Sequence, residues 1–109
     1  VALVKGIREI CDKYRLKTCI MGHIGDGNIH PNIALDLRNE DELKNFKQAK
    51  TELFELALSL NGRLSGEHGI GCEKSRYITK ALDPAALEYM KLIKKTFDPK
   101  NILNPGKIF

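Results

Sequence analysis

The sequence is poor in the features that mark several large classes of protein. Its three cysteines are far apart and form no CxxC pair, which argues against a disulfide framework and against a zinc site made of thiolates. We expect reduced thiols, as in a cytoplasmic protein. No apolar run approaches the roughly 20 residues that a membrane helix needs, and no signal peptide is visible. Aromatic residues make up only 6% of the chain and lysines are interleaved with acidic residues, so a nucleic-acid-binding groove is not expected.

An initiator methionine is also missing, because the chain begins with Val1, and we therefore expect a piece of something longer. Its 109 residues are enough for one small domain with one core. A hydrophobic content of 42% and a charged content of 29% are typical of an ordinary soluble globular protein. The formal net charge of +4 is modest and scattered, which indicates a solvated surface. We expect a single domain over residues 1–109.

Hydrophobic periodicity predicts the secondary structure. Helices are predicted over residues 2–15, 40–60, 73–81 and 84–97. Strands are predicted over residues 18–24, 29–36 and 63–65. Asn39 with Glu42 resembles a capping box at the start of the long helix. The apolar stripe of the last helix is expected to be Leu87, Met90, Ile93 and Phe97. This order of elements favours an α+β fold, a small antiparallel sheet with helices packed on one face, similar to an incomplete ferredoxin-like unit.

The most informative segment is His23-Ile24-Gly25-Asp26-Gly27-Asn28-Ile29-His30. An Asp-Gly pair between two strand-like runs is a strong hairpin signal, because Gly tolerates the positive φ of tight turns. If Asp26 and Gly27 form a two-residue turn, His23 lies directly across from His30, with Cβ atoms roughly 4.5–5.5 Å apart. Two neutral imidazoles at that spacing can share one metal ion. Asn32 is expected on the same polar face as His30.

A second candidate site lies in the Gly-rich segment 66–71, where Glu67 stands beside His68. Two histidines and one carboxylate suit zinc with an open position, or a facial-triad metal such as iron or manganese. Glu67 could therefore complete a site begun by His23 and His30, which would leave His68 available for proton transfer. The same residues are compatible with plain structural roles, as half-buried polar residues of a strand and as an ion pair in a loop.

Three segments carry a resemblance to a known family, and they are HIGDGNIHPNI, GRLSGEHGIGCEKSRYI and FDPKNILNPGKIF. Together they resemble the carboxy-terminal domain of FAD-linked oxidases. This group includes glycolate oxidase large subunits, D-lactate dehydrogenases and D-2-hydroxyglutarate dehydrogenases, within the vanillyl-alcohol-oxidase-type flavoproteins. The three segments occur in the family's order and run from about residue 18 to the end of the chain. The resemblance implies the carboxy-terminal part of a substrate (cap) domain, with the FAD-binding domain lying outside this chain.

The resemblance also implies roles for individual residues. It assigns His23, His30 and Glu67 as ligands of a divalent metal, zinc first, with manganese or iron as alternatives. It assigns His68 as the general base and Asn32 as a contact of the substrate carboxylate. Asn104 is expected near the flavin.

The activity implied by the resemblance is the oxidation of a D-2-hydroxy acid to a 2-oxo acid, with hydride transfer to FAD. The implied partners are the small hydroxy acid, the FAD-binding domain of the same chain, and iron–sulfur electron-transfer subunits that could hold the protein at a membrane. A homodimer of the fragment is a further expectation, and the isolated fragment is expected to be inactive. Two rival hypotheses remain open at this point. One is a stand-alone metal-binding regulatory or interaction domain, and the other is a small metallohydrolase.

Overall fold

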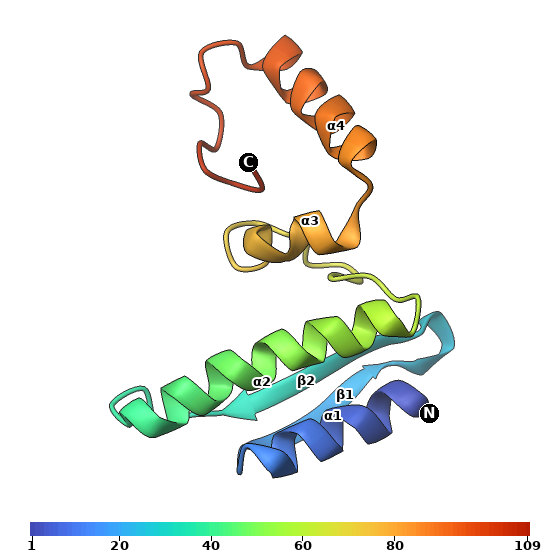
Figure 1. Ribbon diagram of the computed structural model, residues 1–109, viewed down its shortest axis with the longest axis vertical. Coiled ribbons are helices and arrows are strands. Elements are labelled where there is room, and N and C mark those ends of the chain that lie inside the picture. The colour runs from blue at the N-terminus through green and yellow to red at the C-terminus, as the bar shows by residue number, and fades with distance from the viewer. The chain divides into compact units, whose positions relative to one another are not determined.

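The computed structural model describes residues 1–109 and divides the chain into two compact units, Val1–Gly62 and Arg63–Phe109. The helices and strands of each unit are labelled in Figure 1. None of the helices has both the length and the apolar character that crossing a membrane requires.

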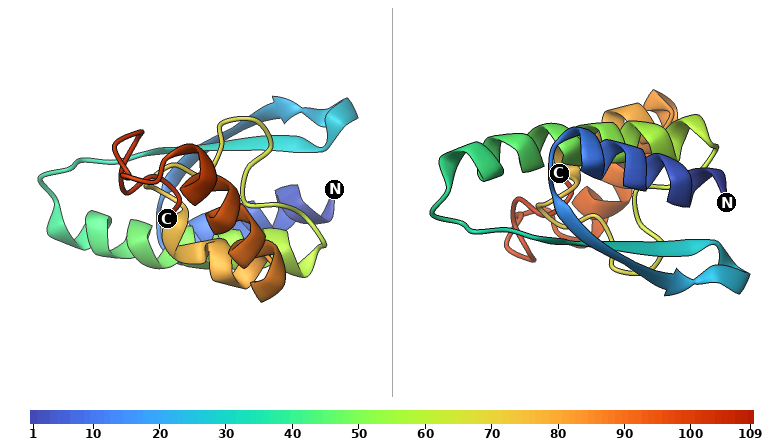
Figure 2. Two further views of the ribbon diagram at one scale, coloured as in Figure 1. Left: turned by 90° about the horizontal axis from the view of Figure 1, so that it is seen from above. Right: turned by 90° about the horizontal axis from the view of Figure 1, so that it is seen from below.

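The first unit contains two helices and a two-stranded antiparallel sheet. Along the chain its elements are α1 (Ala2–Lys13), β1 (Lys17–His23), β2 (Asn28–Ala34) and α2 (Glu40–Ser59). Both helices cover the same face of the sheet, so this unit has one helical layer and one sheet layer (Figure 2). The α+β class, with a small antiparallel sheet and helices on one of its faces, is confirmed.

The core of the first unit lies between these two layers. Its buried residues are Ile7, Cys11, Leu16 and Ala49. Ile20, Ile29 and Ile33 of the sheet pack against this cluster from the other side. Alternation along the strands places these three isoleucines on one face, because successive side chains of a strand point to opposite sides. Burial raises the pKa of the Cys11 thiol, so this cysteine behaves as a small apolar residue of the core.

The start of α2 follows the predicted capping chemistry with one change. The Asn39 side chain accepts hydrogen bonds from the backbone N–H groups of Asp41 and Glu42, at 3.1 and 3.2 Å. The Glu42 carboxylate accepts from the backbone N–H of Asp36 at 3.0 Å, instead of from that of Asn39. Glu42 therefore joins the chain just after β2 to the first turn of α2, while Asn39 caps the helix.

The second unit is mostly irregular between short helices. It contains a 3₁₀ turn, η2 (Ser75–Tyr77), and two helices, α3 (Ile78–Ala81) and α4 (Pro84–Phe97). Asp83 caps α4, since its side chain accepts from the backbone N–H of Ala85 at 2.8 Å. The predicted strand over residues 63–65 is wrong. The only sheet has two strands, and without a neighbouring strand this short segment has no ladder to join.

The apolar stripe of α4 differs from the prediction in its burial. Leu87 is buried and Met90 is partly buried, whereas Ile93 and Phe97 are 60% and 80% exposed. The helical period was predicted correctly, but only the first half of the stripe reaches a core.

Candidate metal centre

The β1–β2 hairpin has an inner face toward α1 and α2 and an outer face turned away from them. The register pairs His23 with Asn28, Met21 with His30 and Cys19 with Asn32. Since paired residues of a ladder share one face, these side chains stand together on the outer face. The outer face of the hairpin is formed by Lys17, Cys19, Met21, His23, Asn28, His30, Asn32 and Ala34.

The predicted register was wrong by two positions, because His23 and His30 are diagonal neighbours and not directly opposite each other. The reason is the loop. Instead of a two-residue Asp-Gly turn, residues 24–27 form a 3₁₀ turn, η1 (Ile24–Asp26), followed by Gly27 in the left-handed conformation with φ of 69°. The Gly27 N–H donates to the Ile24 carbonyl at 3.3 Å. An even shift of register keeps each side chain on its face, so the prediction that the two histidines share a face is confirmed.

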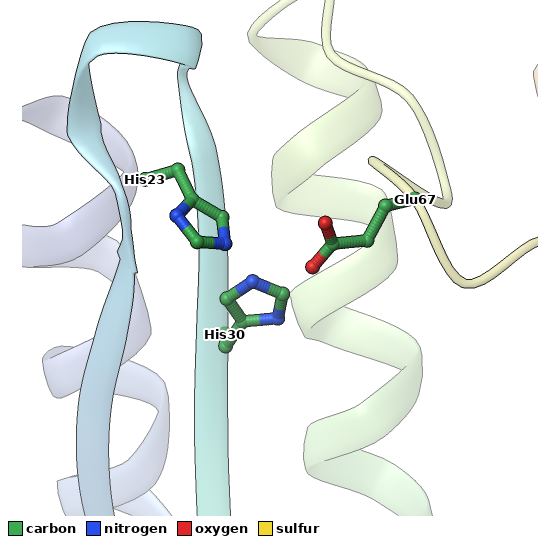
Figure 3. A group of neighbouring side chains, drawn as sticks. All are labelled: His23, His30 and Glu67. Carbon is green, nitrogen blue, oxygen red and sulfur yellow. The ribbon is translucent and has the colours of Figure 1, made fainter.

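The two imidazole rings contact each other on the outer face of the hairpin. Their centroids are 5.4 Å apart and their planes are nearly perpendicular, at 89° (Figure 3). His23 is exposed and His30 is partly buried. Each neutral ring offers one nitrogen lone pair, and imidazole suits zinc, iron and related divalent metals. The pair therefore fits two ligands of such an ion.

The backbone beside His23 requires a glycine. A Cβ added at Gly22 would collide with the carbonyl oxygen of Asn28 on the neighbouring strand. Only a residue without a side chain lets the two strands approach this closely next to His23. The position of the histidine pair thus depends on this glycine as well as on the loop.

Glu67 and His68 belong to the second unit and lie in the irregular segment after α2. The Glu67 carboxylate and Nε2 of His68 are 3.4 Å apart. The Glu67 side chain is 48% exposed and the His68 side chain is 73% exposed. The side chains drawn in Figure 3, His23, His30 and Glu67, together offer two imidazole nitrogens and a carboxylate oxygen. This is the donor set that the sequence analysis expects for a divalent metal with an open position.

The two asparagines of interest lie in different surroundings. Asn32 is exposed on the outer face of the hairpin and donates from its amide to the His30 carbonyl oxygen at 3.3 Å. It is therefore held beside the histidine pair, as expected. Asn104 lies in the carboxy-terminal tail with φ of 49°, and its carbonyl accepts from the Lys107 N–H at 3.3 Å.

Asp98 holds the tail that carries Asn104, a role that the sequence analysis missed. Its buried carboxylate accepts from the backbone N–H groups of Ile102 and Leu103 at 2.9 and 3.0 Å, and pairs with Lys94. The Lys94 ammonium also donates to the Leu103 carbonyl at 2.6 Å. The Lys94 hydrogen bond holds the pKa of Asp98 below its ordinary value, against a smaller opposing effect of burial.

The same tail is joined to the Gly-rich segment. The Ile108 N–H donates to the Gly71 carbonyl at 3.0 Å, and the Lys107 ammonium lies 3.1 Å from the sulfur of Cys72. In the sequence, Asp98 before Pro99 signals only the end of α4, and nothing in the residue pattern indicates that its carboxylate binds the tail.

Residues 1–108 match the family described as FAD linked oxidases, C-terminal domain. The chain belongs to this family. The resemblance carried by the three sequence segments is therefore confirmed, and it extends over both units of this FAD-linked oxidase domain.

Several curated proteins are similar to the domain. It is 47% identical over 107 residues to the glycolate oxidase subunit GlcD of Bacillus subtilis, covering 98% of this chain and 23% of that protein. It is 38% identical over 106 residues to the mitochondrial D-lactate dehydrogenase [cytochrome] of Arabidopsis thaliana, covering 97% and 19%. It is 47% identical over 92 residues to the D-2-hydroxyglutarate dehydrogenase of Stutzerimonas stutzeri, covering 81% and 19%. The FAD-linked oxidase domain thus spans about a fifth of the length of these relatives.

Proposed function

We propose that this chain is the carboxy-terminal part of the substrate domain of an FAD-dependent enzyme that oxidises a D-2-hydroxy acid to a 2-oxo acid. The observation that carries the proposal is the family match over residues 1–108. The matched relatives are named for glycolate, D-lactate and D-2-hydroxyglutarate, which are all 2-hydroxy acids. The chemistry of the histidine pair is consistent with binding the carboxylate and hydroxyl of such a substrate through a metal.

His23, His30 and Glu67 hold a divalent metal, and zinc is the first choice because imidazole nitrogen and carboxylate oxygen are its ordinary ligands. Manganese and iron accept the same donor set. A bound metal would lower the pKa of an oxygen that it coordinates, as metals do for water. The two imidazoles are supplied by adjacent strands, which is a rigid support for a ligand pair.

The remaining residues act on the substrate. His68 takes the hydroxyl proton at an imidazole nitrogen, and its exposed ring is accessible to a small ligand. Asn32 donates to the substrate carboxylate from the outer face of the hairpin. A bound flavin would supply the acceptor for the hydride of the α-carbon. Asn104 would contact the flavin, from a tail that Asp98 holds in place.

The FAD-binding domain precedes this chain in the full-length protein and packs against α4. One side of α4 carries Tyr89, Ile93 and Phe97 at a spacing of four residues, and these side chains are 69%, 60% and 80% exposed. Adjacent exposed side chains of this size mark an interface. In the full-length protein, the hydroxy acid and iron–sulfur electron-transfer subunits are the further partners, and those subunits hold a cytoplasmic enzyme near a membrane.

The activity is tested with the full-length protein containing bound FAD. Under anaerobic conditions, we expect glycolate, D-lactate or D-2-hydroxyglutarate to bleach the flavin absorbance, with formation of the matching 2-oxo acid. The L-enantiomer of lactate serves as the control. If none of these acids reduces the flavin while dithionite does, the hydroxy-acid proposal is wrong. Hydrolysis of a substrate without flavin reduction would favour the metallohydrolase instead.

The α4 interface is tested in the same protein. We expect Phe97→Asp to weaken FAD retention and to raise the hydrogen exchange of α4, because it places a charge in an apolar contact. The matched control is Leu37→Asp, the same kind of apolar-to-charged change at another exposed apolar side chain, 72% exposed, in the first unit. If α4 is already protected in the 109-residue chain, it is covered by this chain's own first unit. If protection appears only with dimerisation, a second copy covers it. Either result contradicts the proposed interface.

A further inference from the structure

The outer face of the hairpin carries a soft ligand that the proposed metal site does not use. Met21 is paired directly with His30 in the ladder and is two residues from His23 on the same strand. Its side chain is 58% exposed, so the thioether is accessible. Directly paired residues on one face have Cβ atoms roughly 4.5–5.5 Å apart, a distance that the flexible methionine side chain can easily span toward the imidazole.

The chemistry of these three side chains differs from that of a zinc site. Thioether sulfur is a soft ligand that favours Cu(I), and imidazole binds copper as well as zinc. Zinc sites are built from thiolate, imidazole and carboxylate, and thioether is not among their usual ligands. In a set of one thioether and two imidazoles, the thioether of Met21 is therefore the ligand that favours Cu(I) over zinc.

We propose that Met21, His23 and His30 form a Cu(I) site on the outer face of the hairpin. All three ligands belong to two paired strands of the first unit, so the site needs neither Glu67 nor the flavin. The rings of His23 and His30 already contact each other, at 5.4 Å between centroids. Cys19 is left out, because it is paired with Asn32 and its short side chain is diagonal to His30.

The site has a consequence that rests on the proposed function. Cu(I) would take the two histidines that the divalent metal needs, so the two metals exclude each other. Copper would then inhibit the full-length enzyme by replacing its divalent metal, and Met21 would determine how strongly it does so. Binding itself is measured without any activity, so failure of the hydroxy-acid proposal would leave the copper proposal standing.

The test is an anaerobic titration of the 109-residue chain with Cu(I) buffered by a chromophoric chelator. The chain has two methionines, Met21 and Met90, which allows a matched pair of variants. We expect one Cu(I) per chain, an affinity lowered about tenfold or more by Met21→Leu, since even changes around a ligand cost 10- to 100-fold, and no change with Met90→Leu. Zinc affinity should be the same in both variants. Leucine has nearly the volume of methionine, so the fold is retained.

Two further measurements make the result unambiguous. X-ray absorption of the copper-loaded chain should show a Cu–S contribution that is lost in Met21→Leu and kept in Cys19→Ser. An unchanged Cu(I) affinity in Met21→Leu would overturn the proposal. So would loss of the sulfur signal in Cys19→Ser alone, because it would assign the sulfur ligand to the thiol.

Discussion

The two units of this chain are stabilised by different means. The first unit has a sheet, two long helices and a cluster of buried side chains between them. The second has short helices joined by irregular backbone, whose tail is held by the Asp98 carboxylate and by the Gly71 carbonyl. Its longest helix exposes Tyr89, Ile93 and Phe97. The first unit therefore has the burial expected of a self-supporting fold, whereas the second presents apolar surface suited to a further partner.

The residues of the proposed site are also divided between the two units. The first unit supplies the histidine pair from a rigid hairpin, and the second supplies Glu67, His68 and Asn104 from irregular segments. Paired strands fix ligand geometry without help from a substrate, while groups on loops can adjust to one.

The largest effect is expected from substitutions of histidines in the full-length enzyme. His68→Ala should lower the rate of the chemical step about 10²- to 10⁴-fold, the ordinary cost of losing a general base, with metal content unchanged. His30→Ala in the first unit should lower metal content and activity together. Elemental analysis beside steady-state kinetics separates the two. If His68→Ala loses metal as completely as His30→Ala, then His68 is a ligand and its assignment as the base is wrong.

The next effect concerns the stability of the two units. Ile7→Ala should destabilise the first unit by about 2–5 kcal/mol, because it leaves a cavity in a core where Ile7 is 2% exposed. Leu92→Ala on α4, at a side chain that is 57% exposed, is the control and should cost much less. Urea unfolding followed by far-ultraviolet circular dichroism measures both. Equal losses would show that the two units share one core and would remove the contrast between them.

A smaller effect is expected at the start of α2. Asn39→Ala removes the acceptor for the N–H groups of Asp41 and Glu42 and should cost about 1 kcal/mol of stability. Asn39→Asp keeps the acceptor and should be nearly neutral, and it serves as the control. Thermal unfolding of the two variants provides the comparison. A neutral Asn39→Ala would mean that Glu42 alone holds the connection through the Asp36 N–H.

The smallest effect is local and depends on pH. Because the pKa of Asp98 is lower in the folded tail than its ordinary value of 3.8, folding of the tail is favoured above that value. The stabilisation is lost as the pH falls below 3.8, since the released carboxyl binds protons more readily than the folded one. The protection of the Ile102 and Leu103 amides, taken as the ratio of intrinsic to observed exchange rate, should therefore fall on acidification before that of the first unit. Asp98→Asn should show this loss of protection already at neutral pH, and an unchanged tail in this variant would contradict the role of the carboxylate.

Much of the local structure was determined by the sequence alone. The helical period predicts α1, α2 and α4 to within a few residues, and Asn39 caps α2 as expected. The shared face of His23 and His30 was also predictable, because alternation in strands survives any even change of register. These features depend on interactions between residues close in the sequence, which a single chain reveals.

Tertiary structure decided the rest. The four-residue loop, and not the Asp-Gly dipeptide, determines that Met21 is paired with His30, and backbone bonding within the loop outweighs the preference of two residues for a tight turn. Asp98 binds its tail through backbone N–H groups that become accessible only once the chain has turned after α4. Periodicity places Ile93 and Phe97 on the apolar side of a helix. Whether they are buried depends on a second surface that covers them, and the sequence of the helix does not show whether there is one.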